Sequence, residues 1–276
     1  MAFEPERTVD YSGYTSLKIS LADRILTIAL YNPGRRNAVT PNMSVELARI
    51  WEDVWEDSNV AVVILTGDGD SFCSGADLSI LAESTGKAEP KPQPLNRTTR
   101  IVRKHVMGVI DCEKPVIAKV RGPAYGLGAT LLMACDMVFA APNAKICDSH
   151  VKAGMAAGDG GVLLWPLAIG FHRAKEYLMT GDPVPAEEAE RIGLINRVIA
   201  EDQLDAHVQA LAEKLRDLPP HAVNYTKAAL NVALKQMTQS GFETSLAYEL
   251  YSMQTEDHQE AMAAFGEKRK GRFMGK

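Results

Sequence analysis

The sequence predicts an α/β fold of repeated strand–strand–helix units, followed by a helical C-terminal region. Short runs such as residues 60–66 and 115–120 are rich in β-branched side chains and bounded by polar turns, as buried strands are. Residues 121–140 combine the end of a strand, a glycine-rich turn, an apolar helix and another apolar run. From residue 201 onward the composition becomes helical. These three observations together favour repeated units over a plain doubly wound sheet.

The predicted elements follow one another with little intervening chain. The strands are expected at 14–20, 24–31, 60–66, 115–120 and 145–147, and the helices at 40–56, 98–111, 126–134, 202–218, 222–236, 242–253 and 257–270. A further helix is expected to open at residues 74–77. Residues 84–96 are rich in proline and charge, which predicts a surface loop that is either a lid over the site or an inert insertion. The predicted organisation is an N-terminal arm (1–13), an α/β core (14–200) and a helical subdomain (201–276).

Composition excludes several classes of function. The chain has 276 residues, and its net charge of −5 argues against general binding to nucleic acid. The four cysteines show no C-x-x-C spacing, which is typical of reduced thiols in a cytoplasmic protein. No apolar run reaches the ~20 residues of a membrane helix, and the first residues lack the apolar segment of a signal peptide. The histidines show no metal-ligand spacing, so no metal site is expected.

Two glycine-bearing turns stand out, because each follows an apolar strand and precedes a predicted helix. The first is residues 74–77 (SGAD) and the second is residues 126–128 (GLG). The first N–H groups of a helix have no partner inside it and favour negative charge. Two such turns can aim N–H groups at one oxygen atom that gains charge during a reaction. The alternative is a pair of tight connections whose glycines only allow close packing.

Together with Asn37-Ala38 after Asn32-Pro33, these turns resemble the crotonase (enoyl-CoA hydratase/isomerase) superfamily, from about Tyr14 to the C-terminus. The resemblance implies a superhelix of β-β-α units and a C-terminal subdomain that forms trimer contacts and helps to close the CoA site. It implies an oxyanion hole for an acyl-CoA thioester, with the N–H groups of Ser74 and Leu127 as donors. Coenzyme A is then part of the substrate, and no separate cofactor is expected. The implied substrate-binding positions are Ala38, Gly75, Ala76, Asp77, Gly126, Thr130 and Lys268.

The acid/base positions differ from the family pattern. Enoyl-CoA hydratases of this family use two glutamates, and the matching positions here hold Thr130 and His150. His150 with Asp159 resembles the pair of the oxocamphor hydrolase branch, which cleaves a carbon–carbon bond between two carbonyls by water attack. We therefore expect His150 to be the base, oriented by Asp159 or Asp148, because a carboxylate fixes the tautomer and raises the basicity of an imidazole. The alternatives are a hydrogen-bonded core histidine and an Asp159 that caps a helix beginning at Gly160.

Three functions follow from this pattern. The first is an enoyl-CoA hydratase/isomerase type of reaction through an enolate of a CoA thioester. The second is hydrolytic carbon–carbon cleavage of a β-diketone or β-ketoacyl substrate by the His–Asp pair. The third is an acyl-CoA-binding subunit without catalysis, because both glutamates are absent. The resemblance implies a homotrimer or homohexamer as the assembly.

Overall fold

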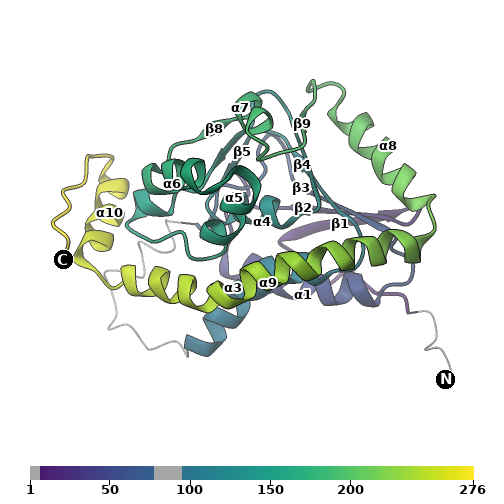
Figure 1. The fold of residues 1–276 in the computed structure, drawn as a ribbon, viewed down its shortest axis with the longest axis horizontal. Helices are drawn as coiled ribbons and strands as arrows, with labels where there is room; N and C mark the ends of the chain where they lie inside the picture. Colours follow the sequence, from purple (N-terminus) through teal and green to yellow (C-terminus); the bar gives the residue numbers. More distant parts are fainter. Residues whose placement is uncertain (1–6, 78–94) are drawn as a thin grey trace.

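The computed structural model describes residues 7–77 and 95–276 of the chain. This part is a mixed α/β structure in which helices surround a large and a small β-sheet (Figure 1). The strands are β1 (Leu17–Ala22), β2 (Ile25–Leu30), β3 (Val62–Gly67), β4 (Val116–Val120), β5 (Pro123–Tyr125), β6 (Met137–Ala140), β7 (Lys145–Cys147), β8 (Val184–Pro185) and β9 (Arg197–Val198). The helices are α1 (Pro41–Glu56), α3 (Leu95–Asp111), α4 (Leu127–Ala134), α5 (Gly161–Ile169), α6 (Phe171–Thr180), α7 (Ala186–Arg191), α8 (Leu204–Arg216), α9 (Pro220–Ser252), α10 (Glu256–Glu267) and the 3₁₀ helix η1 (His150–Ala153).

The large sheet has the order β1-β2-β3-β4-β6-β9 within the described residues. Its first two strands form an antiparallel hairpin, whose turn residues Asp23 and Arg24 both have positive φ, as a tight two-residue turn requires. All later strand pairs of this sheet are parallel. In their register, Ile64 of β3 lies opposite Thr27 of β2 on one side and opposite Ile117 of β4 on the other. The parallel strands are buried on both faces, which explains their nearly continuous apolar sequences.

Alternation along β3 divides its side chains between two apolar clusters. Val63 and Leu65 belong to the main core, which also receives α1, α3 and α4. Val62 and Ile64 face a smaller cluster under α8. Successive residues of a strand point to opposite faces, so one short run supplies both layers.

The small sheet determines where the glycine-rich turn lies. Its strand β5 pairs in parallel with β7, and Tyr125 is the partner of Cys147 in the register. The chain leaves β5 into α4 and leaves β7 into η1, so both turns emerge at the same edge of the sheet. The N–H of Gly126 donates to the carbonyl of Cys147, 2.8 Å away, which ties the two turns together. The predicted strand–strand–helix repeat is confirmed in β4-β5-α4 and continues in β6-β7 with η1 and α5.

Helix α9 corrects one prediction. We expected two helices, at 222–236 and 242–253, but the structure has one helix of 33 residues. A glycine inside a helix costs about 1 kcal/mol relative to alanine. Here a β-carbon on Gly241 would lie 2.9 Å from Leu163 of α5, so the glycine lets the two helices approach closely. The next residue, Phe242, is fully packed in the main core, which offsets that cost.

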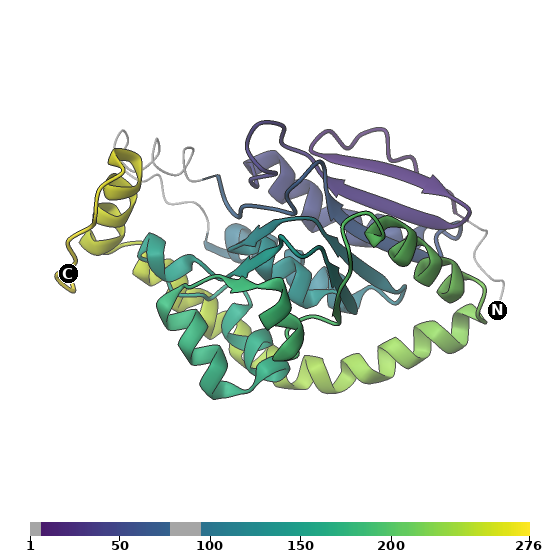
Figure 2. The same ribbon diagram turned by 90° about the horizontal axis from the view of Figure 1, so that it is seen from above.

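The C-terminal helices wrap one side of the core and then leave it. In both views α10 lies at the opposite end of the molecule from the β1–β2 hairpin (Figures 1 and 2). Its His258 bonds through Nδ1 to the carbonyl of Ala153 in η1, at 2.7 Å. Helix α10 is thereby attached to the short element that begins at His150. None of the helices in the described ranges is both long and apolar enough to cross a membrane.

Two predictions fall partly outside the described residues. The loop at 84–96 lies outside them except for its last residues, which begin α3 at Leu95 rather than at 98. The helix expected to open at 74–77 does not begin within the chain up to Asp77. Of the N-terminal arm, residues 7–13 are described, and the carbonyl of Arg7 accepts from the N–H of Ser58 at 3.0 Å. This part of the arm therefore lies against the turn that follows α1.

Candidate active site

The first glycine-bearing turn is held between two other backbone segments. On one side, the N–H of Val39 donates to the carbonyl of Gly75 at 2.8 Å. On the other side, the N–H of Tyr125 donates to the carbonyl of Cys73 at 2.8 Å, and the N–H of Cys73 donates to the carbonyl of Pro123 at 3.1 Å. Residues 73–77 thus pair like a short strand between residues 38–39 and β5. Because β5 belongs to the small sheet, this sheet determines where residues 73–77 lie.

The two glycine turns touch each other without side chains between them. A β-carbon on Gly75 would lie 2.8 Å from the carbonyl oxygen of Tyr125, and a β-carbon on Gly126 would lie 3.7 Å from the α-carbon of Gly75. Both glycines have positive φ, +85° and +52°, which other residues adopt only at a cost. The two turns expected to lie together are therefore in contact, and glycine is required at position 75 by sterics.

The two expected oxyanion donors differ in availability. Leu127 is the first residue of α4 after the N-cap Gly126, and in the described part of the chain its N–H has no acceptor. The N–H of Ser74 instead donates to the carbonyl of Arg36 at 3.0 Å. Arg36 and Asn37 both have positive φ, so this carbonyl sits in an unusual turn. The structure brings the two turns together, but Ser74 can serve a substrate oxygen only after the Arg36 carbonyl moves aside.

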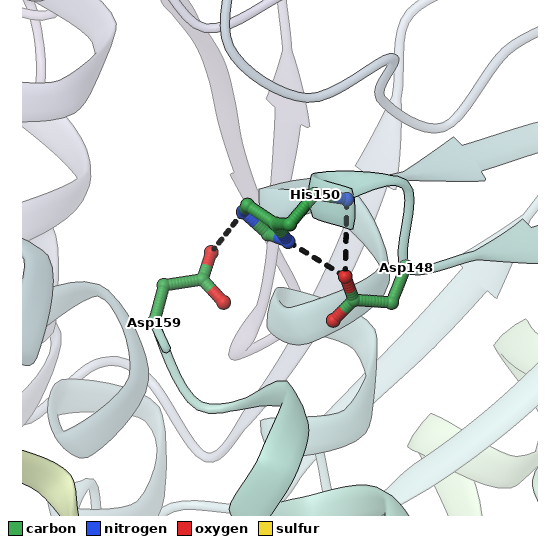
Figure 3. Close-up of side chains that lie close together, drawn as sticks. All are labelled: Asp148, His150 and Asp159. Atoms are coloured by element: carbon green, nitrogen blue, oxygen red, sulfur yellow. Dashed lines mark hydrogen bonds and ion pairs between the residues drawn. The ribbon is translucent and has the colours of Figure 1, made fainter. Parts of the chain in front are cut away.

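Next to these turns lies an imidazole between two carboxylates (Figure 3). Nδ1 of His150 is 2.6 Å from Oδ1 of Asp148, and Nε2 is 3.4 Å from Oδ2 of Asp159. Asp148 follows β7 directly, His150 begins η1, and Asp159 lies in the loop before α5. All three side chains are buried. Cε1 of the imidazole comes within 3.9 Å of a β-carbon placed on Gly126, so this triad borders the glycine turns.

Thr130 supports the triad from α4. Its hydroxyl donates to Oδ1 of Asp159 at 2.9 Å, and it is fully buried. Thr130 was expected to contact substrate, whereas the structure shows it orienting the carboxylate of Asp159. The N-cap of α5 is Gly160, which has no side chain, and the carboxylate oxygens of Asp159 face Thr130 and His150 instead of the first N–H groups of α5.

The triad stabilises charge on the imidazole. Burial by itself lowers the pKa of His150, but the charges of Asp159 and Asp148 outweigh burial and raise this pKa well above 6.5. Burial raises the pKa of Asp159, but the His150 charge and the hydrogen bonds from His150 and Thr130 lower it below its usual range. At neutral pH the resting site therefore contains an imidazolium and an aspartate carboxylate. This modifies our expectation that His150 is the base, since a charged ring must first give up its proton.

Glu249 is a site residue that the sequence analysis missed. It lies on α9, and burial, followed by the charge of Asp159, raises the pKa of Glu249 to about 8. Its Oε2 is buried without a hydrogen-bond partner among the described residues. On the same helix, Ser245 donates to the carbonyl of Gly158 at 2.8 Å and Ser252 accepts from the N–H of Ala156 at 3.0 Å. These bonds attach α9 to the loop that carries Asp159, which no local sequence pattern indicates.

The other predicted site positions have structural contacts of their own. Ala76 forms a parallel bridge with Val39, and the N–H of Asp77 donates to the Val39 carbonyl at 3.1 Å. The carbonyl of Ala38 accepts from the side chain of Asn32 at 2.8 Å. These contacts place Ala38, Ala76 and Asp77 beside the first glycine turn. Lys268 is the left-handed C-cap residue of α10, and no contact of its side chain with the triad occurs in the described residues.

The donor atoms of Asp148, His150 and Asp159 are close enough together to surround a metal ion. Each ring nitrogen of His150, however, already faces a carboxylate oxygen. A metal would need one of these nitrogens as a ligand and would replace that ion pair. The expectation of no metal site stays a prediction, and hydrogen bonding accounts for the arrangement of the three side chains.

Comparison with known proteins identifies the family. A family model described as enoyl-CoA hydratase/isomerase matches residues 21–276. The chain belongs to the enoyl-CoA hydratase/isomerase family, and it is an enzyme of the crotonase superfamily. It is 32% identical to the crotonyl-CoA hydratase of Syntrophomonas wolfei over 268 residues, which are 96% of this chain and 100% of that protein. It is 31% identical to the 1,2-epoxyphenylacetyl-CoA isomerase of Escherichia coli over 252 residues, 91% of this chain and 95% of that protein.

The fold agrees with this family. The crystal structure of an enoyl-CoA hydratase/isomerase from Mycobacterium paratuberculosis has a TM-score of 0.85 to this structure and 35% sequence identity. The match covers 92% of this chain and 99% of that one. The crotonase-like fold expected from the sequence is therefore confirmed. Within this family fold, Asp148, His150 and Asp159 form a buried cluster of interacting ionisable side chains.

We predict that Asp148→Asn lowers the pKa of His150, because it removes the charge closest to Nδ1. The folded pKa lies above the unfolded value of about 6.5, so the stability from charging His150 is fully present below 6.5 and is lost as pH rises through the folded pKa. Asp148→Asn should therefore reduce the free energy of unfolding by about 2 kcal/mol in mildly acidic solution, and by less in alkaline solution. Imidazole NMR titration and urea unfolding at several pH values measure both effects.

The matched control is Asp182→Asn, which removes an exposed carboxylate bound to Lys152 of η1 at 3.1 Å. Asp182 is near the same element but does not contact the imidazole. This control should leave the titration of His150 unchanged. If both variants shift the titration equally, or if neither does, Asp148 is not a specific cause of the raised pKa of His150.

Proposed function

We propose that this enzyme acts on an acyl-CoA thioester by proton transfer at the α-carbon, as an enoyl-CoA hydratase or isomerase does. The observation that carries the proposal is the buried imidazole of His150 between Asp148 and Asp159, beside the free N–H of Leu127. The free N–H group at the start of α4 supplies a positive end for the thioester oxygen. The His–Asp pair supplies one proton donor and one proton acceptor within 3.4 Å of each other.

Hydration then proceeds with every atom accounted for. The thioester oxygen accepts a hydrogen bond from the Leu127 N–H, which favours negative charge on that oxygen. Water adds its oxygen to the β-carbon as the double bond opens, and its proton passes to the Asp159 carboxylate. The imidazolium of His150 gives a proton to the α-carbon. Asp159 returns a proton to His150 across their contact, and the pair is restored. In the reverse direction His150 is the base.

A histidine at position 150 compensates for the threonine that stands at position 130 in place of a glutamate. A threonine hydroxyl does not act as a general acid or base near neutral pH. A single acid/base residue at position 150 would therefore have no catalytic partner at position 130. In this proposal Asp159, which accepts a hydrogen bond from Thr130, takes the role of the missing carboxylate, and the neutral carboxyl of Glu249 is a further acidic group of the site. Donor and acceptor are thus regrouped around His150 instead of being divided between two glutamates.

The decisive variant is His150→Gln, which keeps polar contacts with both carboxylates but cannot carry a proton. Alanine is a poorer choice, because it leaves two buried charges unpaired. We expect kcat with crotonyl-CoA to fall roughly 100-fold or more, the usual size of a general acid–base contribution. The dissociation constant for a saturated acyl-CoA should stay within a few-fold. Lys152→Gln, an exposed change in the same 3₁₀ helix, should leave both quantities unchanged. Wild-type turnover that survives in His150→Gln would contradict the mechanism.

We expect the ionisation of Glu249 to cause a decrease of kcat at alkaline pH, the alkaline limb of the pH profile. Its carboxyl is neutral below about 8 and becomes a third negative charge above it. That charge would repel the enolate and draw the proton of His150 more tightly, so kcat should fall as pH rises through about 8. Glu249→Gln stays neutral and should lose this limb. Glu243→Gln changes an exposed residue of the same helix, paired with Arg103, and should retain it. A limb that persists in Glu249→Gln assigns it to another group.

The triad also favours a second candidate, hydrolysis of a carbon–carbon bond between two carbonyls. An imidazole between two carboxylates is a unit that can activate water, and the N–H of Ser74 is engaged by Arg36 rather than free for a thioester. Incubating the enzyme with cyclic β-diketones, β-ketoacyl-CoAs and enoyl-CoAs separates the two functions. Diketone cleavage without hydration of enoyl-CoA would establish the hydrolase, whereas hydration alone would eliminate it. A homotrimer or homohexamer stays a prediction in either case.

A further inference from the structure

Some buried polar atoms without a hydrogen-bond partner belong to side chains on which the charge of Asp159 acts, those of His105 and Glu249. Among the described residues, those without a hydrogen-bond partner include Oδ2 of Asp148, Oε2 of Glu249 and Nδ1 of His105. The first two belong to the site already described. His105 lies on α3, and Asp159 acts electrostatically on its ring. A buried acceptor without a partner is destabilising, because the hydrogen bond that it made with water in the unfolded chain is not replaced. We therefore expect Nδ1 of His105 to bind a hydrogen-bond donor that the mechanism above does not include.

The hydrogen-bond pattern determines the tautomer of His105. Its Nε2 lies 2.8 Å from the carbonyl oxygen of Ser44 and 3.1 Å from the hydroxyl of the same residue. A carbonyl oxygen can only accept, so Nε2 carries the hydrogen. The side chain is 2% exposed, and burial lowers the pKa of His105, so the ring is neutral. Nδ1 is consequently a lone-pair acceptor on a ring that α1 holds in place.

The neighbouring residue shows how α3 approaches the site. A β-carbon on Gly160, which directly follows Asp159, would lie 3.4 Å from Cγ2 of Val106 and 2.9 Å from Cγ2 of Thr130. The turn of α3 that carries His105 and Val106 is therefore packed against the bend that carries Asp159. His105 approaches from α3, whereas His150 approaches from η1. The Asp159 carboxylate thus lies near two histidines, of which one is charged and one is neutral.

We propose that His105 Nδ1 and the Asp159 carboxylate together bind one water molecule, and that this water is the one that adds to the substrate. Both groups are acceptors, so a molecule that bridges them must donate two hydrogens. Water does so, whereas a substrate hydroxyl has only one hydrogen to give. Buried waters typically make about three hydrogen bonds, and the carboxyl of Glu249 is a further polar group near Asp159. The use of this water rests on the proposed hydration, but its binding does not.

The structural arm of the test is a crystal structure at a resolution that shows ordered water. The wild-type enzyme should hold a water within hydrogen-bond distance of both His105 Nδ1 and Asp159. In His105→Gln, whose amide can still donate to the Ser44 carbonyl, this water should be lost or displaced. His105→Phe, which has no polar atom, should lose it as well. Ser44→Ala removes only the hydroxyl contact and should retain it. If the wild-type enzyme has no water at Nδ1, the proposal is overturned whatever reaction the enzyme catalyses.

The kinetic arm separates positioning of water from structural support. Exchange of the α-proton of a saturated acyl-CoA with deuterated solvent requires the Leu127 N–H and His150 but no addition of water. His105→Gln should lower kcat for hydration roughly tenfold and leave this exchange unchanged. Equal losses in both reactions would show a merely structural role and overturn the assignment, as would unchanged hydration. A wild-type enzyme that holds the water but hydrates no enoyl-CoA would refute the proposed function and leave the water site standing.

Discussion

The close contact between Gly75 and Gly126 is the constraint on which the site depends. A side chain at position 75 would meet the carbonyl of Tyr125 at 2.8 Å, so the two turns can touch only because position 75 lacks a side chain. The small sheet sets this contact, since β5 pairs with β7 and residues 73–77 pair with both β5 and Val39. Because β5 and β7 are parallel, the chain leaves both strands at the same end of the small sheet. Asp148 and His150, which follow β7, therefore lie beside Gly126, which follows β5. The fold thereby delivers a free N–H and an acid/base group to one place.

The remaining site residues come from segments that have to be brought to this edge separately. Thr130 arrives on α4, Asp159 on the loop before α5, and Glu249 on the long helix α9. Helix α9 is bound to the Asp159 loop through Ser245 and Ser252, and α10 is bound to η1 through His258. The C-terminal helices therefore do more than cover the core. They hold the two loops that carry the acid/base groups against the small sheet.

Much of the fold and the centre of the site could be predicted from the sequence, because local patterns encode them. Apolar β-branched runs indicated β3 and β4, Thr40-Pro41 indicated the start of α1, and the glycine turns indicated where α4 begins. The pairing of His150 with Asp159 followed from the family resemblance. Glu249 could not be found in this way, because its role depends on the packing of α9 against a loop far away in the sequence. The same holds for the Ser74 N–H, whose acceptor Arg36 adopts a left-handed conformation that its residue type does not suggest. The unbroken α9 was missed because its continuity depends on packing: the contact of Gly241 with α5 and the burial of Phe242 are tertiary features.

The protonation states of the site are linked to one another. Asp159 stays ionised because the imidazolium of His150 and the hydroxyl of Thr130 stabilise its charge. The charge of Asp159 in turn contributes to keeping the proton on Glu249 and on His150. A proton that leaves His150 for the substrate removes the main stabilisation of the Asp159 carboxylate and raises its affinity for a proton at that moment. Asp159, which accepts the proton of water, thus becomes a stronger base when His150 gives up its own proton. In the proposed mechanism, this coupling lets one His–Asp pair perform both proton transfers.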